Sequence, residues 1–494
     1  MTVAADYAGS TSTSFPRGTR DERLRRGLLY VVIFIVAIAR LLTETLGILP
    51  RAINLADIPL FFFACAVLIF RNGPSEPGCQ FFRRSLSRPL KGFSLCAVLS
   101  IMVNGLFYGI HLLPAISFLI FHLEPMVFAL LFLRLGWAEH DTQTLATLLL
   151  GIGLLQIPMS LLQLSTAFSE DNPDLASGTF GTNGSQMCFF LILVIAYLLG
   201  RYLMEASMRW LLPIIPLVIV FYAQGFKAMW LPFVVTMAVP ILLFSPRVKR
   251  KKVLSVVLIL VVAIFIAFPV GMATSSQTMQ FMRWEYANDV LRSGAIWELG
   301  KIQAFLNISR LYRDAPLSAF VGVGPGSFSS RAFLTFTEVS PDPEAPTNVT
   351  HGYIEPIAPG VFAEKYVVPL VFKSEILFGS STIDGPYNSY VSLMGEVGLI
   401  GFALYFLVYY RVFRRAITAA REAKRQGNPL LFAISIAAIC GCLTIAQMAF
   451  LDNWVEVSRV TLPLWLLLLP VISSHGALPY VEDSTNNMCN SREQ

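Results

Sequence analysis

Charged side chains are scarce in this sequence. They make up 14% of its 494 residues, whereas hydrophobic residues make up 55%. A soluble domain carries roughly 25% charged residues, so the composition argues against an ordinary soluble chain of two or three domains. The apolar residues fall in long runs, and a helix needs about 20 of them to cross a bilayer. The sequence therefore predicts a polytopic membrane protein.

Sites of the familiar soluble kinds are also missing. Of the seven cysteines, only Cys79 and Cys489 lie outside apolar stretches, and no zinc spacing occurs, which makes a disulfide framework unlikely to be the basis of the fold. The sequence has no phosphate-cradling loop ending in Gly-Lys-Ser/Thr, no nucleophile elbow and no pair of histidines at helical metal spacing. It also shows no internal repeat. We expect no cofactor and no metal ion.

The apolar runs predict an all-α polytopic fold with about 12 transmembrane helices. The predicted spans are Leu28–Ile48, Ile53–Phe70, Gly92–Ile110, Pro114–Leu133, Thr144–Leu164, Ser185–Leu199, Trp210–Tyr222, Met229–Phe244, Val253–Met272, Leu393–Tyr410, Leu430–Leu451 and Val457–Ile472. The predicted organisation is a tail (1–27), helices one to nine (28–272), a large loop (273–392), helices ten to twelve (393–473) and a second tail (474–494). The first span reads as an uncleaved signal anchor.

The basic residues predict the orientation. They gather in short runs at Arg17–Arg26, Arg83–Lys91, Arg247–Lys252 and Arg411–Arg425. If the spans alternate from a cytoplasmic N-terminus, these runs all fall inside, as the positive-inside rule requires. The net charge of +6 is therefore explained without a nucleic-acid partner. We expect a multi-pass protein of the bacterial inner membrane with both termini in the cytoplasm.

Two long connections fall on the outer side, Ser165–Gly184 and Ala273–Ser392. The second is too long for an ordinary connection, its many aromatic residues predict order, and Met279–Tyr312 has a helical pattern. Its charge is polarised: Ala273–Arg331 holds six basic and four acidic residues, and Ala332–Ser392 holds two basic and seven acidic residues. The basic half is either a surface for a phosphate-bearing substrate or an ordinary solvated helix face.

Three segments resemble motifs of the O-antigen ligase and polymerase family. They are Ser177–Asn183 (SGTFGTN), Phe320–Phe328 (FVGVGPGSF) and Tyr387–Gly401 (YNSYVSLMGEVGLIG). Their order and their positions, before the sixth helix, in the large loop and at its exit into the tenth helix, also match that family. Each motif alone is a weak signal, and the glycine-rich stretch by itself predicts only a tight turn.

The resemblance implies a chemistry. Members of that family are metal-independent glycosyltransferases whose donor is a polyprenyl-diphosphate-linked glycan, which they join to a second glycan or to lipid A core. Cationic side chains would hold the diphosphate leaving group, because negative charge develops on it as the glycosidic bond breaks. Arginine suits this task through its bidentate fork and lysine as a point charge.

Candidate cations follow from these positions. Lys227 lies in an outer turn where the family commonly has arginine; its alternative role is snorkelling to a lipid headgroup. The large loop adds Arg331, directly after the glycine-rich turn, and four further arginines. These are Arg283, Arg292, Arg310 and Arg313. For each of these four arginines taken singly, the alternative interpretation is an ordinary surface residue.

The residue that deprotonates the acceptor is harder to assign. The ligases have a histidine where this chain has Tyr387, so that role cannot be carried over. His351 is the loop's only histidine and could transfer a proton near neutral pH; otherwise it is an incidental polar residue. Asn388 and Glu396 match the loop-exit motif, either in catalysis or in capping and orienting the helix. Glu124 is a further candidate for a direct role.

Other charges fall in or near predicted spans, where they are costly and usually face the protein interior. Arg40 and Glu44 are four residues apart and could pair on one helix face. Asp57, Asp452 and Glu456 are most simply structural partners or cavity lining.

We therefore expect a polymerase of exopolysaccharide or O-antigen repeat units. Its partners would be the lipid-linked oligosaccharide donor, a glycan acceptor, membrane lipids and components of a polysaccharide export system. An O-antigen ligase is the alternative within the family. A secondary transporter is the alternative from another class, although transporters usually show two related halves and modest outer loops.

Overall fold

The computed structural model describes residues 20–50, 53–54, 56–70, 77–170, 173–181, 183–224, 229–244, 300–337, 357–371 and 386–474. Within these ranges the regular structure is helical, apart from one isolated bridge between Thr337 and Ile357. The longer helices are α1 (Arg20–Ala37), α2 (Asp57–Phe70), α4 (Ser87–Phe107), α5 (Leu112–Arg134), α6 (Glu139–Ser169), α7 (Gly184–Glu205), α8 (Ile214–Ala223), α9 (Trp230–Phe244), α13 (Gly300–Asp314), α18 (Ser389–Gln426), α19 (Pro429–Leu451) and α20 (Ser458–Ser473). Shorter helices are α3 (Pro77–Phe81), α14 (Ser318–Val321), α15 (Arg331–Phe336) and α16 (Val361–Tyr366).

Six helical segments of the described ranges are long and apolar enough to cross a membrane. They are Gly78–Phe107, Leu112–Arg134, Glu139–Ala167, Gly184–Glu205, Ser389–Gln426 and Pro429–Leu451. Five of them contain a predicted span, and Gly78–Phe107 overlaps the predicted span Gly92–Ile110 but ends three residues before it. Shorter apolar helices occupy Asp57–Phe70, Met208–Ala223, Trp230–Phe244 and Ser458–Ser473, where spans were also predicted. The predicted span Val253–Met272 lies outside the described residues.

Several helix ends differ from the predicted ones. The first span was predicted to run to Ile48, but α1 ends at Ala37 and a π-helical turn at Leu41–Thr45 follows. In contrast, α18 continues well beyond Tyr410 to Gln426. This extension carries the basic run Arg411–Arg425, which continues the helix because arginine and lysine are good helix formers. The prediction ended at Tyr410 because hydropathy marks only the apolar part of such a helix.

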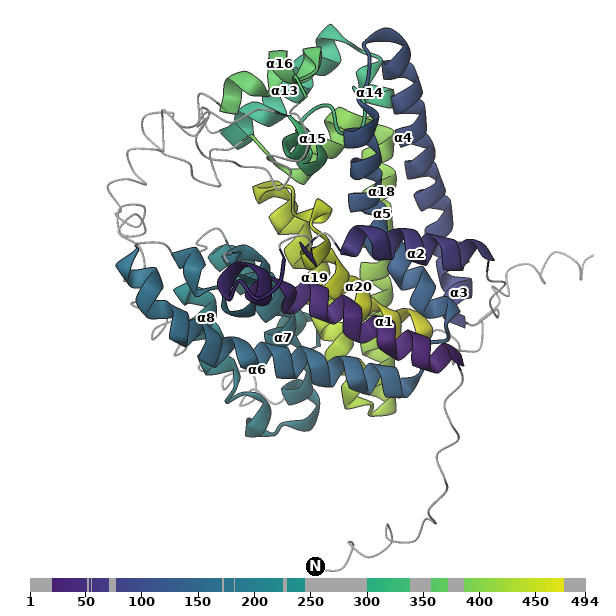
Figure 1. Cartoon of the computed structure of the whole chain (residues 1–494). Coiled ribbons are helices and arrows are strands. Elements are labelled where there is room, and N and C mark those ends of the chain that lie inside the picture. The colour runs from purple at the N-terminus through teal and green to yellow at the C-terminus, as the bar shows by residue number, and fades with distance from the viewer. Residues whose placement is uncertain are drawn as a thin grey trace, which may run out of the picture.

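Helices α7, α18, α19 and α20 form the centre of the bundle (Figure 1). Almost every side chain of α7 and α20 is buried. The axes of α7 and α19 approach so closely at Gly200 that a Cβ there would lie 2.6 Å from the Cα of Ala433. Small residues permit this kind of contact between helices in a membrane. By contrast, α4 exposes Leu95, Met102 and Leu106 on its outer face, as a lipid-facing helix does.

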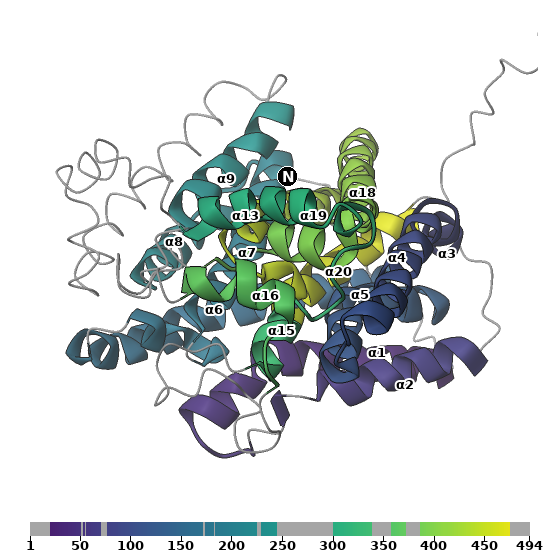
Figure 2. The same ribbon diagram turned by 90° about the horizontal axis from the view of Figure 1, so that it is seen from above.

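The described part of the long loop packs as a small helical cap on the bundle. Helices α13, α14, α15 and α16 lie at the top of the molecule in Figure 1, and α13, α15 and α16 lie over the centre of the bundle in Figure 2. A second apolar cluster, which includes Leu311, Phe328 and Phe333, fills the space beneath them. Asp314 of α13 accepts hydrogen bonds from Lys365 (2.8 Å) and Tyr366 (2.5 Å) of α16, and these bonds lower the pKa of Asp314. The helical pattern predicted for Met279–Tyr312 is confirmed from Gly300 onward.

Polar contacts at the far end of the bundle join segments that were predicted to share the cytoplasmic side. Arg25 pairs with Asp141 at 2.7 Å, and Arg415 donates to Ser474 Oγ at 2.9 Å. Lys424 donates to the carbonyl of Phe244 at 2.8 Å. These contacts agree with the predicted grouping of the connections. Which compartment that end faces stays a prediction.

Candidate functional site

The carboxylate of Glu396 anchors the glycine-rich loop to α18. Its two oxygens accept the backbone N–H groups of Gly326 (2.5 Å), Phe328 (3.1 Å), Ser329 (3.0 Å) and Ser330 (2.9 Å). Glu396 is fully buried, and a carboxylate out of water is stable only where donors of this kind surround it. Glu396 therefore joins two of the three motifs, and its predicted roles in catalysis or in orienting the helix stay predictions.

The glycines of this loop are required by its geometry. Gly322 has φ +73°, and a Cβ there would lie 2.2 Å from the carbonyl oxygen of Glu396. Gly326 has φ +69°, and its Cβ would lie 2.5 Å from the carbonyl carbon of Pro114. Only glycine combines a positive φ with so close an approach to another backbone. The loop thus fits between α5 and α18.

The loop-exit motif is tied to the turn between α19 and α20. Asn388 caps α18 by accepting the N–H of Val391 at 2.8 Å, as expected for one of its two proposed roles. Ser389 donates to the carbonyl of Asp452 at 3.1 Å, and the buried Lys301 of α13 donates to the carbonyl of Tyr387. Asn453 in that turn donates to the carbonyl of Ser329 at 2.6 Å. The glycine-rich loop, the exit motif and this turn therefore form one connected unit.

Glu456 lies at the centre of this unit. Its carboxylate accepts the N–H of Arg331 at 2.7 Å and the hydroxyl of Ser392 at 3.1 Å. The side chain is buried. Burial, and after it the negative charge of Glu396, raises the pKa of Glu456 well above the ordinary value of a carboxyl group. A carboxyl group of this kind keeps its proton to a higher pH than an exposed carboxyl group does, and its carboxylate is the stronger base.

Three arginines from distant parts of the chain lie near one another, and one of them, Arg331, donates its backbone N–H to Glu456. The guanidinium groups of Arg40, Arg331 and Arg459 are close enough to repel one another. Arg459 donates to Asn54 Oδ1 at 3.0 Å, while Asn54 donates to Glu44 Oε1 at 3.2 Å. We call Arg40, Arg331 and Arg459 the arginine cluster.

Acidic side chains accompany the cluster. Arg40 and Glu44 form the predicted pair, with Nε 3.3 Å from Oε1. Asp57 adds a further negative charge near Arg40 and Arg459. Nevertheless, the buried Nη1 of Arg459 has no hydrogen-bond partner among the described residues, and arginine Nη atoms suit phosphate oxygens.

The remaining motif of the three, Ser177–Asn183, lies against the arginine cluster. Gln156 of α6 holds it, accepting the N–H of Thr179 at 2.9 Å and donating to its hydroxyl at 2.7 Å. Gly181 has φ +70°, and a Cβ there would lie 2.4 Å from Glu44 Oε2 and 3.1 Å from Arg40 Cβ. The glycine therefore lets this segment approach the Arg40–Glu44 pair.

Glu124 lies in α5 near the same place. The hydroxyl of Ser458, the residue next to Arg459, donates to Glu124 Oε2. The other oxygen, Oε1, is buried and has no hydrogen-bond partner in the described part of the chain. The nearby His122 donates its ring Nδ1–H to the carbonyl of Phe118 (2.8 Å) and is enclosed by aromatic rings. Glu124 thus lies next to the arginine cluster, whereas the contacts of His122 serve the packing of the fold.

The other predicted cations have different positions. Arg331 belongs to the cluster, but Arg310 and Arg313 are exposed on α13, where Arg310 donates to Asn307 Oδ1 at 3.0 Å. Lys227, Arg283, Arg292 and His351 lie outside the described residues, so their proposed roles stay predictions.

Arg459 and Asn54 were not predicted. Asn54 lies at the boundary of a span and looks like an ordinary connection residue. Arg459 could have been found, because an arginine three residues into an apolar run must have an interior partner.

No protein-family model matches the chain, and no curated protein is significantly similar to it. Among the described residues there is no group of three or more His, Cys, Asp or Glu side chains that could hold a metal ion.

Proposed function

We propose that this protein is a polymerase of polyprenyl-diphosphate-linked glycan repeat units, acting at the periplasmic face of the bacterial inner membrane. One observation carries the proposal. Three motifs that were identified separately, at Ser177–Asn183, Phe320–Phe328 and Tyr387–Gly401, converge around one cluster of three arginines. A structural coincidence would not require all three segments to meet beside the same cations.

The chemistry follows from the charges. An acceptor hydroxyl attacks the anomeric carbon of the donor, the new glycosidic bond forms, and the bond from that carbon to the diphosphate oxygen breaks. Polyprenyl diphosphate leaves with the bonding electron pair. Preformed positive charge at this point lowers the barrier, because it is already oriented when the leaving group develops its charge. Arg459, with an unpartnered Nη1, and Arg331 supply this charge.

The acceptor proton needs a base. Glu456 lies beside Arg331 through its 2.7 Å bond to the Arg331 N–H, and its raised pKa makes its carboxylate a stronger base than an exposed carboxylate. We assign Glu456 the role of general base, with Glu124 as the second carboxyl group at the cluster. Polymerase is preferred to ligase because Tyr387 replaces the histidine that the ligases have at the loop exit.

The test in cells is deletion of the gene followed by analysis of surface polysaccharide length. Loss of long chains with single repeat units retained on their acceptor supports a polymerase. Accumulation of free polymer that is never attached indicates a ligase, and unchanged glycans contradict both.

The test in vitro uses purified protein in lipid nanodiscs with a polyprenyl-diphosphate-linked repeat unit. Arg459→Gln is expected to lower the rate of chain extension about 100-fold, the usual effect of removing one stabilising donor from a developing anion. Arg421→Gln is the matched control, because Arg421 is exposed on the C-terminal part of α18. Equal activity of the two variants would exclude Arg459 from the mechanism. Solute transport into liposomes with no glycan product would instead identify a transporter.

A further inference from the structure

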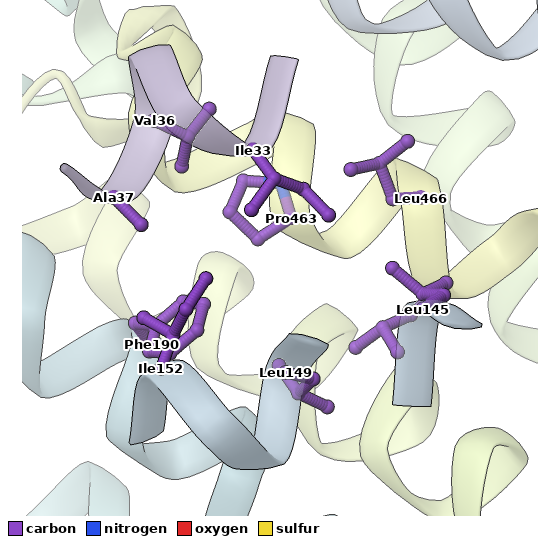
Figure 3. A pocket seen from close by; sticks show the side chains of 10 residues that line it. Ile33, Val36, Ala37, Leu145, Leu149, Ile152, Phe190, Pro463 and Leu466 are labelled. Atoms are coloured by element: carbon purple, nitrogen blue, oxygen red, sulfur yellow. The ribbon is translucent and has the colours of Figure 1, made fainter. Parts of the chain in front are cut away.

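An interior cavity of the bundle lies between α1, α6, α7 and α20 (Figure 3), and apolar side chains such as Ile33, Phe190 and Pro463 line it. Its volume is about 20 Å³, which is room for about one water molecule. A lipid does not fit there. Contacts with lipid therefore belong to the outer surface of the described bundle.

The segment between Asp314 and Arg331 carries no charged residue. It forms α14 and the glycine-rich loop, and it belongs to the large connection that was predicted to lie outside the membrane. Nevertheless, two of its large apolar side chains point away from the protein, because Leu317 is 58% exposed and Phe320 is 61% exposed. Exposed apolar side chains indicate a contact surface where they are part of a larger apolar patch.

The exposed side of α14 continues the apolar surface of two predicted spans. Figure 1 shows α14 beside the upper ends of α4 and α18, and it contacts both helices. A Cβ on Gly398 of α18 would lie 2.5 Å from the carbonyl oxygen of Phe320, and the next two residues of α18, Leu399 and Ile400, are exposed. The end of α4 exposes Leu106. Both helices belong to segments that are long and apolar enough to cross a membrane.

Two buried polar side chains of α4 show how deep this segment lies. The hydroxyl of Ser100 donates to the carbonyl of Glu396 at 2.8 Å, and Asn104 donates to the carbonyl of Gly322 at 3.2 Å. Ser100 is about 10 Å, or about two helical turns, from the end of α4 at Phe107, and Asn104 is about one turn from it. The glycine-rich loop therefore starts level with the last two turns of a predicted span.

The backbone of this loop is suited to such a depth. Non-helical backbone is tolerated inside a bilayer only where the protein itself supplies its hydrogen-bond partners. The N–H groups of Val323 and Gly324 donate to the carbonyls of Gly395 (2.8 Å) and Glu396 (3.2 Å). The carboxylate of Glu396 accepts four further N–H groups of the loop and of the residues that follow it. The polar backbone thus faces α4 and α18, while apolar side chains face outwards.

We propose that α14 and the glycine-rich loop form a re-entrant segment, which enters the bilayer at the cap end of the bundle and places Leu317 and Phe320 against lipid acyl chains. Continuity with the exposed apolar faces of α4 and α18 identifies the partner as the hydrocarbon of the adjacent leaflet. Arg313 and Asp314, both exposed at the end of α13, mark the level at which the chain leaves the water. This position does not depend on the proposed function, because the segment would lie at the same depth in a polymerase, a ligase or a transporter.

Nitroxide labels on single cysteines measure the depth of the segment in proteoliposomes. Leu317→Cys and Phe320→Cys are each made in a chain whose seven natural cysteines are replaced. Met102→Cys on the exposed side of α4 is the matched reference for the bilayer, and Glu364→Cys, exposed on α16, is the reference for water. The collision rate of each label with molecular oxygen, which concentrates in hydrocarbon, is compared with its collision rate with a water-soluble nickel chelate.

The labels at Leu317→Cys and Phe320→Cys are expected to collide with oxygen several-fold more often than with the nickel chelate, as the label at Met102→Cys does. The label at Glu364→Cys is expected to show the opposite preference. Melting temperatures in detergent close to that of the unmodified protein would show that the labelled variants are folded.

Nickel access at both α14 positions equal to that at Glu364→Cys would overturn the proposal. Low access to both reagents would also overturn it, because another part of the protein would then cover the segment. Magnetic broadening between labels would assign this face to a second copy of the chain instead. Activity plays no part in these measurements, so the position of the segment and the polymerase assignment stand or fail separately.

Discussion

Glu396 accepts four backbone N–H groups in a site closed to water. Replacing it with alanine removes every one of these acceptors at once. A buried donor without a partner costs about 1–3 kcal/mol, so Glu396→Ala is expected to lower the free energy of unfolding by at least about 3 kcal/mol. Thermal melting in detergent measures the effect. Glu364→Ala is the control, because Glu364 is exposed on α16, and a similar loss in both variants would contradict the anchoring role.

Glu456 is expected to make the stability of the folded protein depend on pH. Its pKa is raised in the folded protein by burial and by Glu396, so the folded state holds this proton more tightly than the unfolded chain does. The associated stability is fully present below the unfolded pKa and is lost as the pH rises through the folded pKa. Glu456→Gln should therefore weaken the fall in melting temperature between acidic and alkaline pH. A fall of unchanged size would show that another group is responsible.

Activity should change in the opposite direction with pH, because only the deprotonated form of Glu456 can accept a proton from the acceptor hydroxyl. The rate of chain extension is expected to rise as the pH approaches and passes the folded pKa. Glu456→Gln should lose both most of the rate and this rise. A variant that kept the pH profile at a lower rate would have a structural defect only.

At the residue scale, sequence patterns predicted the interactions that are local. The Arg40–Glu44 pair is four residues apart, and the Asn388 cap is three residues from its donor, so both could be inferred from spacing. The cluster of Arg40, Arg331 and Arg459 could not be inferred in that way. Its members come from the segment after α1, from α15 and from α20, and only the packing of these elements brings them together.

Among the elements, the contact between the glycine-rich loop and α18 depends on the absence of side chains. Gly322→Ala would force a positive φ on alanine, at a cost of about 1–3 kcal/mol, and would press a Cβ against the Glu396 carbonyl. We expect this variant to lose chain extension and to become more sensitive to protease within the loop. Gly360→Ala is the control, since the nearest atom to its Cβ would be 3.9 Å away. Protease resistance in both variants would contradict the tight docking.

Helix α18 illustrates how far hydropathy predicts an element. The apolar part was predicted at Leu393–Tyr410, but the helix starts at Ser389 and ends at Gln426. Its first turn depends on the Asn388 cap, and its last turns carry charged residues that have high helix propensity. The non-helical backbone at Gly398, with φ +72°, leaves room for the carbonyl of Phe320. Tertiary packing causes this bend, and no local sequence pattern predicts it.

For the whole molecule, the central prediction is its orientation in the membrane. Glu364→Cys on α16 and Gln426→Cys at the end of α18 place single thiols at exposed positions at opposite ends of the bundle. In a background without other cysteines, a membrane-impermeant maleimide should label Glu364→Cys in intact spheroplasts. Gln426→Cys should be labelled only after the cells are opened. The reverse pattern would place the loop in the cytosol, and the proposed function would have to be abandoned.

The anchoring of the cap has a consequence for how this end of the protein moves. Four hydrogen bonds to Glu396, together with the Asn453–Ser329 bond, fix the glycine-rich loop to α18 and to the turn before α20. Lifting the loop would break all five bonds at once. The loop, the start of α18 and that turn should therefore exchange their amide hydrogens together, as one cooperative unit, and not open one after another.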